Sequence, residues 1–359
     1  MMNPAMQRAL QKARREQKQA EINKRLARYY RMNSILGNQW AIFFVIIGAR
    51  KTGKSYAVAD QFCRDEEKLG PENVKTYWLR ISDTSAKALL VNKADKLIDP
   101  DLKRKYNLDL TTKGNVVYNK GKEFCTVLPL SSFGKMKGVG FYDKDFTGLY
   151  NIILDEFQLE VGERRTSFDI LYNFIGMVEN IARTTKNNIR VYLLGNTLQE
   201  ASAILKAFDF IPESVGRFYL KRKRAVIDNL PITEEYKKDR AGSIADLLGG
   251  DKLSNFTNDL KKDLETVYKG RVWKPTQIIK FTKDEGRWFT VWDGNVIARY
   301  SGQTMPEERC ICMRPYISGY YDREQREKVM EIYDVRGFRF RDLATQAYFT
   351  DELTLIRKQ

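Results

Sequence analysis

The sequence predicts an α/β fold with a mainly parallel central sheet, followed by a smaller α+β domain. Over roughly the first 215 of 359 residues, short apolar runs alternate with polar, helix-compatible stretches. This is the pattern of buried parallel strands that are joined by helical crossovers. Further along, three short β-prone runs are separated by turns of the hairpin type. The length also exceeds what one core usually holds, which favours two domains.

The composition narrows the chemistry that is open to the chain. It holds no histidine, which excludes nucleophile systems with a His base and metal centres with His ligands. The 62 Lys and Arg residues against 46 Asp and Glu residues give a net charge of +16, which favours a polyanionic partner, nucleic acid before membrane. Cys310 and Cys312 are the only close pair among the four cysteines, so we expect free thiols in a reducing compartment. The longest apolar run, Ala41–Ile47, is too short to span a bilayer, and we expect a soluble intracellular protein with no membrane partner.

Residues 1–35 are expected to form a basic N-terminal helical arm. Residues 1–31 contain nine Lys and Arg residues against two Glu residues, and good helix formers dominate. A solvated charged face and a contact with nucleic acid would both account for such a segment. The sequence leaves these two interpretations open.

Residues 36–215 are expected to form the first domain. Its strands are predicted from continuous β-prone apolar runs, which are typical of strands buried on both faces of a parallel sheet. These runs are Ala41–Ile47, Val74–Ile81, Phe124–Leu130, Tyr150–Leu154 and Ile189–Leu194. Polar stretches between them, including Tyr56–Leu69 and Phe168–Arg183, predict the crossover helices.

The character of the sequence changes beyond residue 215. A basic run from Arg217 to Arg224 and a chain break at Asn229-Leu-Pro231 predict a linker region over residues 216–250. Residues 251–359 are expected to form the second domain, with an antiparallel sheet. Its three predicted strands are Thr276–Phe281, Arg287–Trp292 and Asn295–Tyr300.

One segment matches the phosphate-binding pattern G-x-x-x-x-G-K-S/T, and a buried strand precedes it while a helix follows it. The two glycines let backbone amides approach a phosphate, and the helix directs its N-terminal amides at the same anion. Lys54 is expected to reach the β- and γ-phosphates of ATP, and the Ser55 hydroxyl to bind Mg²⁺. The predicted nucleotide-binding residues are Gly48, Ala49, Arg50, Lys51, Thr52, Gly53, Lys54, Ser55 and Tyr56.

A second motif, of the Walker B type, ends a later apolar strand at Asp155-Glu156. Asp155 is placed to bind Mg²⁺ directly or through water, and Glu156 to orient and deprotonate an attacking water. An adjacent Asp-Glu pair favours hydrolysis of a nucleoside triphosphate over phosphoryl transfer by a small kinase. The two motifs together predict a magnesium-dependent ATPase.

Two further catalytic contributions are expected in a hydrolase of this kind. Asn196 follows a strand that ends in Gly195, and it is a candidate for contact with the γ-phosphate or the lytic water. An Arg, from the same chain or from a neighbour, often neutralises charge in the transition state. The residues alone leave this choice open among Arg50, Arg164, Arg165 and Arg183.

The order and spacing of several motifs over roughly residues 30–215 resemble those of the DNA-packaging motor ATPases of phi-29-like tailed bacteriophages, which are terminase-like P-loop NTPases of the ASCE type. Besides the two nucleotide motifs, the resemblance rests on Tyr77-Trp-Leu-Arg80, Pro129-Leu-Ser131 and the Gly195-Asn196 strand end. It implies a homo-oligomeric ring, typically a pentamer, docked at the portal of a viral procapsid in the host cytoplasm. ATP hydrolysis then drives double-stranded DNA through the ring. The basic N-terminal arm departs from the family pattern.

The resemblance also implies roles for residues that act on a neighbouring subunit. The trans-acting Arg of the family matches Arg183, and a trans-acting Lys matches Lys137, with Lys135 as the alternative. These roles add to those of Lys54 and Glu156 that the motifs predict.

The C-terminal domain is implied to resemble a vestigial nuclease of the RNase H type, which has lost its metal-binding acids. A two-metal nuclease needs carboxylates that converge on the sheet, whereas Asp284, Glu285 and Asp293 fall in predicted turns. We therefore expect no nuclease activity, and a basic surface that binds nucleic acid, such as a packaging RNA, or the capsid apparatus.

Two other classes of function stay open at this point. One is a helicase or recombination-type motor that acts on single strands. The other is a nucleotide-gated assembly protein with little hydrolysis, against which the Asp155-Glu156 pair argues.

Overall fold

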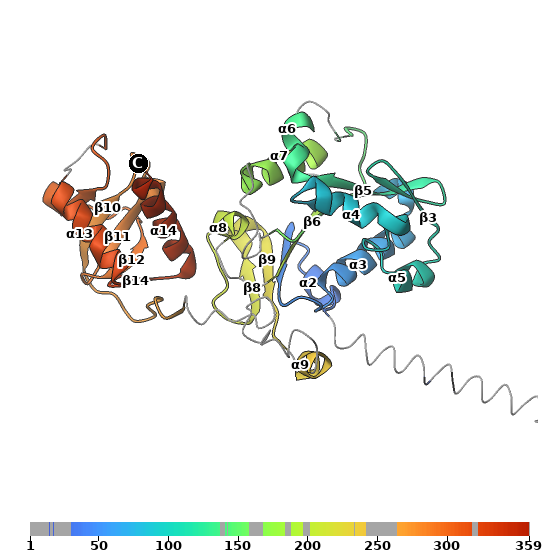
Figure 1. The fold of residues 1–359 in the computed structure, drawn as a ribbon, viewed down its shortest axis with the longest axis horizontal. Coiled ribbons are helices and arrows are strands. Elements are labelled where there is room, and N and C mark those ends of the chain that lie inside the picture. The colour runs from blue at the N-terminus through green and yellow to red at the C-terminus, as the bar shows by residue number, and fades with distance from the viewer. Residues whose placement is uncertain are drawn as a thin grey trace, which may run out of the picture. The chain divides into compact units, whose positions relative to one another are not determined.

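The computed structural model (Figure 1) describes residues 14, 17, 30–136, 141, 143–157, 168–183, 188–196, 202–232, 234–241, 264–317 and 322–358. The chain divides into two compact units. Unit 1 consists of Met1–Thr197 and Val215–Asn258, and unit 2 of Leu198–Ser214 and Asp259–Gln359. The chain therefore leaves unit 1 after residue 197, contributes a short segment to unit 2, and returns to unit 1.

A nine-stranded sheet forms the centre of unit 1, in the order β3-β4-β5-β2-β6-β7-β1-β9-β8. The strands are β1 (Phe43–Ile47), β2 (Val74–Arg80), β3 (Leu110–Lys113), β4 (Val116–Asn119), β5 (Lys122–Pro129), β6 (Leu149–Asp155), β7 (Asn188–Gly195), β8 (Gly216–Leu220) and β9 (Ala225–Asn229). Each neighbouring pair from β5 through β2, β6, β7 and β1 to β9 is parallel, and antiparallel strands complete both edges. This confirms the mainly parallel sheet and the five strands that the apolar runs predict.

Helices cover both faces of this sheet (Figure 1). The described helices of unit 1 are α2 (Asn33–Leu36), α3 (Lys54–Leu69), α4 (Asp83–Ala94), α5 (Pro100–Lys105), α6 (Phe133–Met136), α7 (Ile170–Ala182) and α9 (Glu234–Arg240). Because side chains alternate along a strand, successive residues meet different helices. Phe44 and Tyr192 are buried in one cluster with Phe62 of α3, whereas their neighbours Phe43 and Val191 face α7.

Residues 216–229 are two strands of the sheet, so the linker predicted over residues 216–250 is wrong for this part. β9 pairs in parallel with β1 along its whole length, and all of its residues are buried. The basic run contributes to β8 and to the turn that joins it to β9. The apolar part of β9 is short and directly follows basic residues, so that its pattern did not indicate a buried strand. The hairpin of β3 and β4 was also not predicted, because most of its residues are exposed or half-buried.

Unit 2 contains a five-stranded sheet in the order β13-β10-β11-β12-β14. Its elements are α8 (Ala203–Ala207), β10 (Pro275–Lys280), β11 (Trp288–Trp292), β12 (Val296–Arg299), β13 (Cys310–Cys312), α13 (Arg323–Asp334), β14 (Arg339–Phe340) and α14 (Leu343–Arg357). The three predicted strands are confirmed as the antiparallel set β10, β11 and β12. Asp293 and Gly294, with φ of 50° and 86°, form the turn between β11 and β12. The likeness of this unit to an RNase H-type nuclease stays a prediction.

The core of unit 2 is built around Phe349 of α14, which is fully buried. Its ring contacts several others at centroid distances of 5.1 to 5.8 Å, those of Phe281, Phe289, Phe338 and Phe340. The short segment before β8 also belongs to this unit. Lys206 of α8 pairs with Asp351, and the Tyr348 hydroxyl donates to the Lys206 carbonyl at 2.7 Å.

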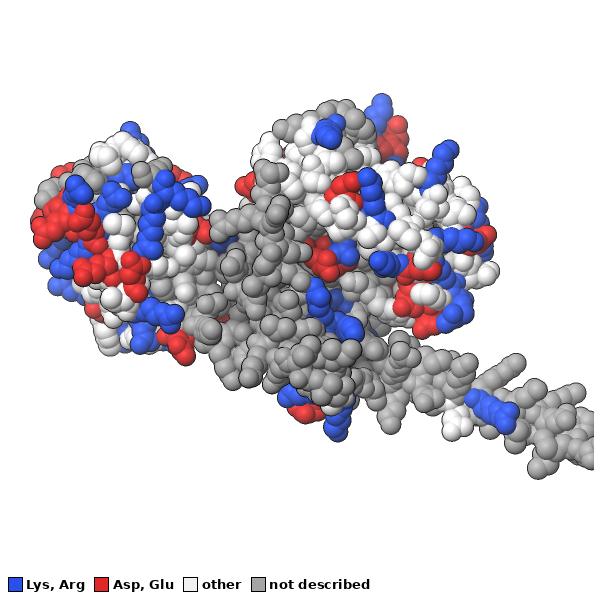
Figure 2. All heavy atoms as spheres, in the orientation of Figure 1, with Lys and Arg blue, Asp and Glu red and all other residues white. Residues whose placement is uncertain are grey.

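On the face drawn in Figure 2, Lys and Arg side chains are interspersed with Asp and Glu side chains on both units. Among the described residues, no helix combines the length and the apolar character needed to cross a bilayer.

Candidate nucleotide-binding and catalytic site

The phosphate-binding segment forms a loop between β1 and α3. Gly53 has a φ of 83° and caps the N-terminus of α3, and Lys51 takes a φ of 63°. Both values lie in the left-handed region, which favours glycine. At Gly48, an added Cβ would lie 3.0 Å from the Cβ of Leu230. The start of the loop therefore packs closely against the residue that follows β9.

Lys54 is buried in the first turn of α3, with 7% of its surface exposed. Its ammonium donates to the carbonyl oxygens of Gly48 and Ala49, both at 2.8 Å, and to Thr52 Oγ1 at 3.3 Å. Burial lowers the pKa of Lys54 to about 8, although the nearby Asp155 carboxylate opposes this shift. The cation is thus held against the loop, where phosphate oxygens can replace its carbonyl partners.

Ser55 and Asp155 bring two oxygen ligands together. Ser55 Oγ donates to Asp155 Oδ1 at 3.2 Å. Burial raises the pKa of Asp155, and the Arg80 guanidinium, 3.6 Å from Oδ2, opposes that rise. Hard oxygen donors of this kind suit Mg²⁺. Since the described residues contain no group of three or more Asp, Glu, Cys or His side chains placed to hold a metal ion, phosphate oxygens and water would have to complete the coordination of a Mg²⁺ ion.

Glu156 follows β6 directly and lies in a different environment from Asp155. Its φ is 60°, and half of its side chain is exposed. Its carboxylate accepts a hydrogen bond from Arg80 Nη1. Arg80 ends β2, which pairs with β6, so that one guanidinium lies beside both carboxylates.

Arg80 has no role in the motif-based prediction. The sequence feature that could have indicated a role for Arg80 is its position as a cation at the end of an apolar strand, Tyr77-Trp-Leu-Arg80. Only the pairing of β2 with β6 places that cation beside Asp155 and Glu156.

Most of the predicted site residues converge on one cavity of about 390 Å³ at the carboxyl edge of the sheet. Parallel strands explain the convergence, because their carboxyl ends lie at the same edge. Asn196, at the end of β7, lines the same cavity as the loop. The lining residues are Arg50, Lys51, Thr52, Gly53, Lys54, Ser55, Tyr56, Asp155, Glu156, Leu194 and Asn196. Gly48 and Ala49 contribute through their carbonyls, which accept from Lys54.

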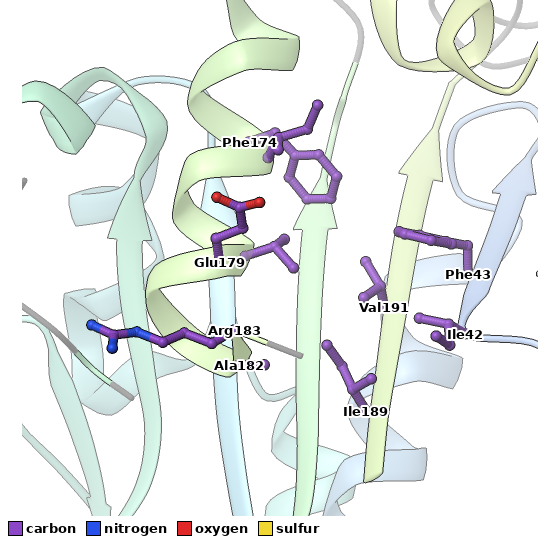
Figure 3. Close-up of a pocket in the computed structure, with 10 residues that line it drawn as sticks. Ile42, Phe43, Phe174, Glu179, Ala182, Arg183, Ile189 and Val191 are labelled. Atoms are coloured by element: carbon purple, nitrogen blue, oxygen red, sulfur yellow. The ribbon is translucent and has the colours of Figure 1, made fainter. Parts of the chain in front are cut away.

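Arg183 lies elsewhere. It caps the C-terminus of α7 with a φ of 40° and borders an apolar pocket of about 270 Å³. Phe43 and Ile189 line this pocket from the amino-terminal ends of β1 and β7, which is the edge of the sheet opposite the nucleotide cavity. In Figure 3 the Arg183 side chain extends away from these apolar side chains.

The predicted trans-acting lysine, Lys137, lies outside the described residues. Its alternative, Lys135, is in α6. Neither is among the described residues that line the nucleotide cavity.

Comparisons with known proteins agree with the fold and with the family that the sequence resembles. Residues 23–294 match a family model described as podovirus DNA encapsidation protein (Gp16). The chain is similar to the solved Phi-28 gp11 DNA packaging motor, with a TM-score of 0.60 and 12% identity over 92% of this chain and 98% of that one. It is also similar to a chain of the bacteriophage phi-29 viral genome packaging motor assembly, with a TM-score of 0.61 and 17% identity over 92% of this chain and 99% of that one. No curated protein matches the sequence significantly. At these identities the structural matches show a shared fold.

Proposed function

Because the chain belongs to the podovirus DNA encapsidation protein (Gp16) family, we propose that it is an ATP-hydrolysing motor that translocates double-stranded DNA into a viral procapsid. A function in DNA packaging follows from the family match and from the fold shared with two packaging motors. The observation that supports ATP hydrolysis is the convergence of Lys54, Ser55, Asp155 and Glu156 on one cavity. The net charge of +16 fits a polyanionic cargo.

In this proposal the loop holds the triphosphate of ATP. Backbone amides of the loop and of the first turn of α3 face the β- and γ-phosphates. The Lys54 ammonium exchanges the Gly48 and Ala49 carbonyls for phosphate oxygens. Ser55 and Asp155 would hold a Mg²⁺ ion, whose charge would offset that of the phosphates.

Glu156 is the proposed general base. Its half-exposed carboxylate is suited to accept a proton from a water that attacks the γ-phosphate in line. A carboxylate has two acceptor oxygens, and Arg80 donates to one of those of Glu156. The other oxygen is proposed to accept from the attacking water. Asn196, at the end of the adjacent strand, is proposed to contact the γ-phosphate or the same water.

We further propose a homo-oligomeric ring, of five subunits, in which Arg183 completes the site of a neighbour. Arg183 lies at the edge of the sheet opposite its own nucleotide cavity, so it suits a role in trans. A head-to-tail contact that repeats from subunit to subunit closes into a ring and brings one edge to the next nucleotide. Lys137 is the second proposed trans-acting cation.

The proposed setting is the host cytoplasm, with the ring docked on the portal of the procapsid. Unit 2 is proposed to be a vestigial RNase H-type nuclease that binds nucleic acid, such as a packaging RNA, or the capsid apparatus. Binding to phosphates rather than to base edges would let the motor move DNA of any sequence.

The test measures ATP hydrolysis with and without duplex DNA, together with ATP-dependent protection of DNA from DNase by purified procapsids. Protected DNA and DNA-stimulated hydrolysis with the wild-type chain, and neither with Lys54→Ala, are the expected results. Unwinding of forked substrates without any capsid component would indicate a single-strand motor instead. ATP binding without turnover in a single-turnover assay would indicate a nucleotide-gated assembly protein.

A further inference from the structure

Two carbonyl groups of the phosphate-binding loop accept hydrogen bonds from residues that are distant in sequence. The Tyr236 hydroxyl donates to the Arg50 oxygen at 2.7 Å, and the Tyr30 backbone N–H donates to the Thr52 oxygen at 3.0 Å. We propose that Tyr30 and Tyr236 are positioning residues that aim the loop's amides at the phosphates of ATP. This inference rests on the ATP site proposed above.

The geometry of the peptide bond links each of these carbonyls to an amide. In a planar trans peptide, the C=O and the following N–H point in opposite directions. An Arg50 oxygen held toward Tyr236 therefore directs the N–H of Lys51 away from Tyr236, and a Thr52 oxygen held toward Tyr30 directs the N–H of Gly53 away from Tyr30. Both Lys51 and Gly53 line the nucleotide cavity, whereas neither tyrosine is among its described lining residues. The two amides are therefore directed away from the tyrosines, and the proposal places them facing the phosphates of ATP.

The conformation of Lys51 supports a need for this restraint. Its φ of 63° places a residue with a Cβ in the left-handed region, which persists only where the surroundings hold it. The hydrogen bond from Tyr236 acts on the peptide that contains the Lys51 nitrogen. It therefore acts at a position whose backbone conformation is unfavourable for a residue with a Cβ.

Both tyrosines are connected to β9. The Tyr30 hydroxyl donates to Asp228 Oδ2 at 2.7 Å, and the buried Asp228 also accepts from Arg217 of β8 at 2.6 and 2.8 Å. Burial and the Asp228 carboxylate raise the pKa of Tyr30, so that its hydroxyl stays a donor. Tyr236 is on α9, which begins at Glu234, soon after β9 ends. The loop is thus held from the strand that pairs with β1.

Lys54 acts on other carbonyls of the same loop, those of Gly48 and Ala49. When phosphate oxygens replace those two partners, the contacts of Tyr30 and Tyr236 persist, because they involve different peptides. Without the Tyr236 contact, the free loop populates other conformations, and the affinity for MgATP falls by the fraction of molecules that keep the binding conformation. The bound ground state and the transition state need the same loop conformation, so KM rises and kcat stays largely as it was.

The test compares Tyr236→Phe and Tyr30→Phe with Tyr118→Phe, a control on β4 near the other edge of the sheet. Calorimetry with full-length protein would give the Kd of MgATP and MgADP, and steady-state assays would give KM and kcat. Loss of one hydrogen bond should raise both the Kd and the KM of Tyr236→Phe by about three- to tenfold, with kcat unchanged. Tyr30→Phe should change them in the same direction but less, because its backbone donor stays. Tyr118→Phe should change none of these values.

Wild-type Kd and KM in Tyr236→Phe would overturn the proposal, as would a loss of kcat at constant Kd. The proposal would also be overturned if the nucleotide-free variant had a lower Tm and this loss of stability fully explained its weaker binding of MgATP. The effect would then be one on folding and not on the loop. Failure of the wild-type chain itself to bind MgATP would instead remove the proposed function, so the two failures are distinct.

Discussion

Asp155 and Glu156 are adjacent in sequence, yet their side chains differ in exposure and in partners. Asp155 ends a fully buried strand, where burial raises its pKa and the Ser55 hydroxyl is within hydrogen-bonding distance. The left-handed backbone of Glu156 accompanies a side chain that is half exposed. One carboxylate is therefore suited to a metal ion, and the other to proton transfer with water.

Replacing Glu156 by Gln removes the proposed base while keeping its size. We expect kcat for ATP hydrolysis to fall by about 10²- to 10⁴-fold, with the Kd of MgATP nearly unchanged, because the loop and Lys54 are intact. Stopped-flow or steady-state phosphate release would measure the effect. The exposed Glu327→Gln in unit 2 is the control. Near-normal turnover in Glu156→Gln would reject the role of the residue.

The depressed pKa of Lys54 predicts a pH dependence. With a pKa of about 8 in the free protein, Lys54 loses its charge as the pH rises through that value, so kcat/KM for ATP should decline above it. kcat at saturating ATP should hold to higher pH, since bound phosphates favour the charged form. A pH series at constant ionic strength measures both. A kcat/KM that stays flat well above pH 8 contradicts the prediction.

The lowered pKa of Lys54 also changes the free energy of unfolding with pH, in a defined direction. Between pH 8 and the ordinary value of 10.5, Lys54 binds more protons in the unfolded chain than in the folded one. The contribution of this residue to the free energy of unfolding therefore increases as the pH rises through that window.

Among the secondary-structure elements, β9 supports the nucleotide loop through several separate contacts. It pairs with β1 along its whole length, Leu230 beyond its end packs against Gly48, and its Asp228 anchors Tyr30. The hairpin with β8 brings Arg217 to the same carboxylate. The conformation of the loop therefore depends on a strand pair that lies far from it in sequence.

Removal of the Arg217 side chain tests this arrangement. Arg217→Ala takes a bidentate partner from a buried carboxylate and should lower the free energy of unfolding of unit 1 by about 2–4 kcal/mol. Arg357→Ala breaks an exposed pair with Asp334 and should cost about 0.5 kcal/mol or less. Denaturant-dependent hydrogen exchange of the β9 and α14 amides would measure the two effects separately. If the two variants lost the same free energy of unfolding, the result would contradict the importance of the contact between Arg217 and Asp228.

At the scale of the whole molecule, the path of the chain connects the nucleotide cavity to unit 2. Asn196 lines the cavity at the end of β7, the segment Leu198–Ser214 belongs to unit 2, and the chain returns to unit 1 at β8. Within unit 2, α8 is held to α14 through Lys206. The end of β7 and the first segment of unit 2 are therefore close neighbours in sequence.

The proposed ring predicts complementation between two inactive variants. A site needs its own Lys54 and a neighbour's Arg183, so Lys54→Ala and Arg183→Ala should each abolish hydrolysis alone. In an equal mixture, about a quarter of the sites combine an intact Lys54 with a neighbour's intact Arg183, if subunits assemble at random and head to tail. ATPase activity should therefore reappear on mixing. Arg104→Ala, at an exposed pair with Asp101, is the active control. A mixture that stays inactive would place Arg183 outside the neighbour's site.

Much of the candidate site was predictable because its motifs are local. The run from β1 through the loop into α3 is continuous in sequence, and its glycines, Lys54 and Ser55 have roles that follow from spacing alone. Asp155, Glu156 and Asn196 follow apolar strands, and parallel strands bring their carboxyl ends to one edge. Arg80, Tyr30 and Tyr236 were not predictable in the same way, because nothing in their local pattern distinguishes them from other polar or aromatic residues.

Local patterns were enough to predict the type of fold, the main strands of unit 1, the hairpin strands of unit 2 and the residues that form the nucleotide loop. Three placements became visible only in the folded chain: β9 lies beside β1, Arg80 lies beside both carboxylates, and Arg183 lies at the edge of the sheet opposite the nucleotide cavity. The reason is physical. Hydrophobic periodicity and turn residues act over a few positions, whereas the order of strands is set by which buried faces and backbone partners fit together across the whole sheet.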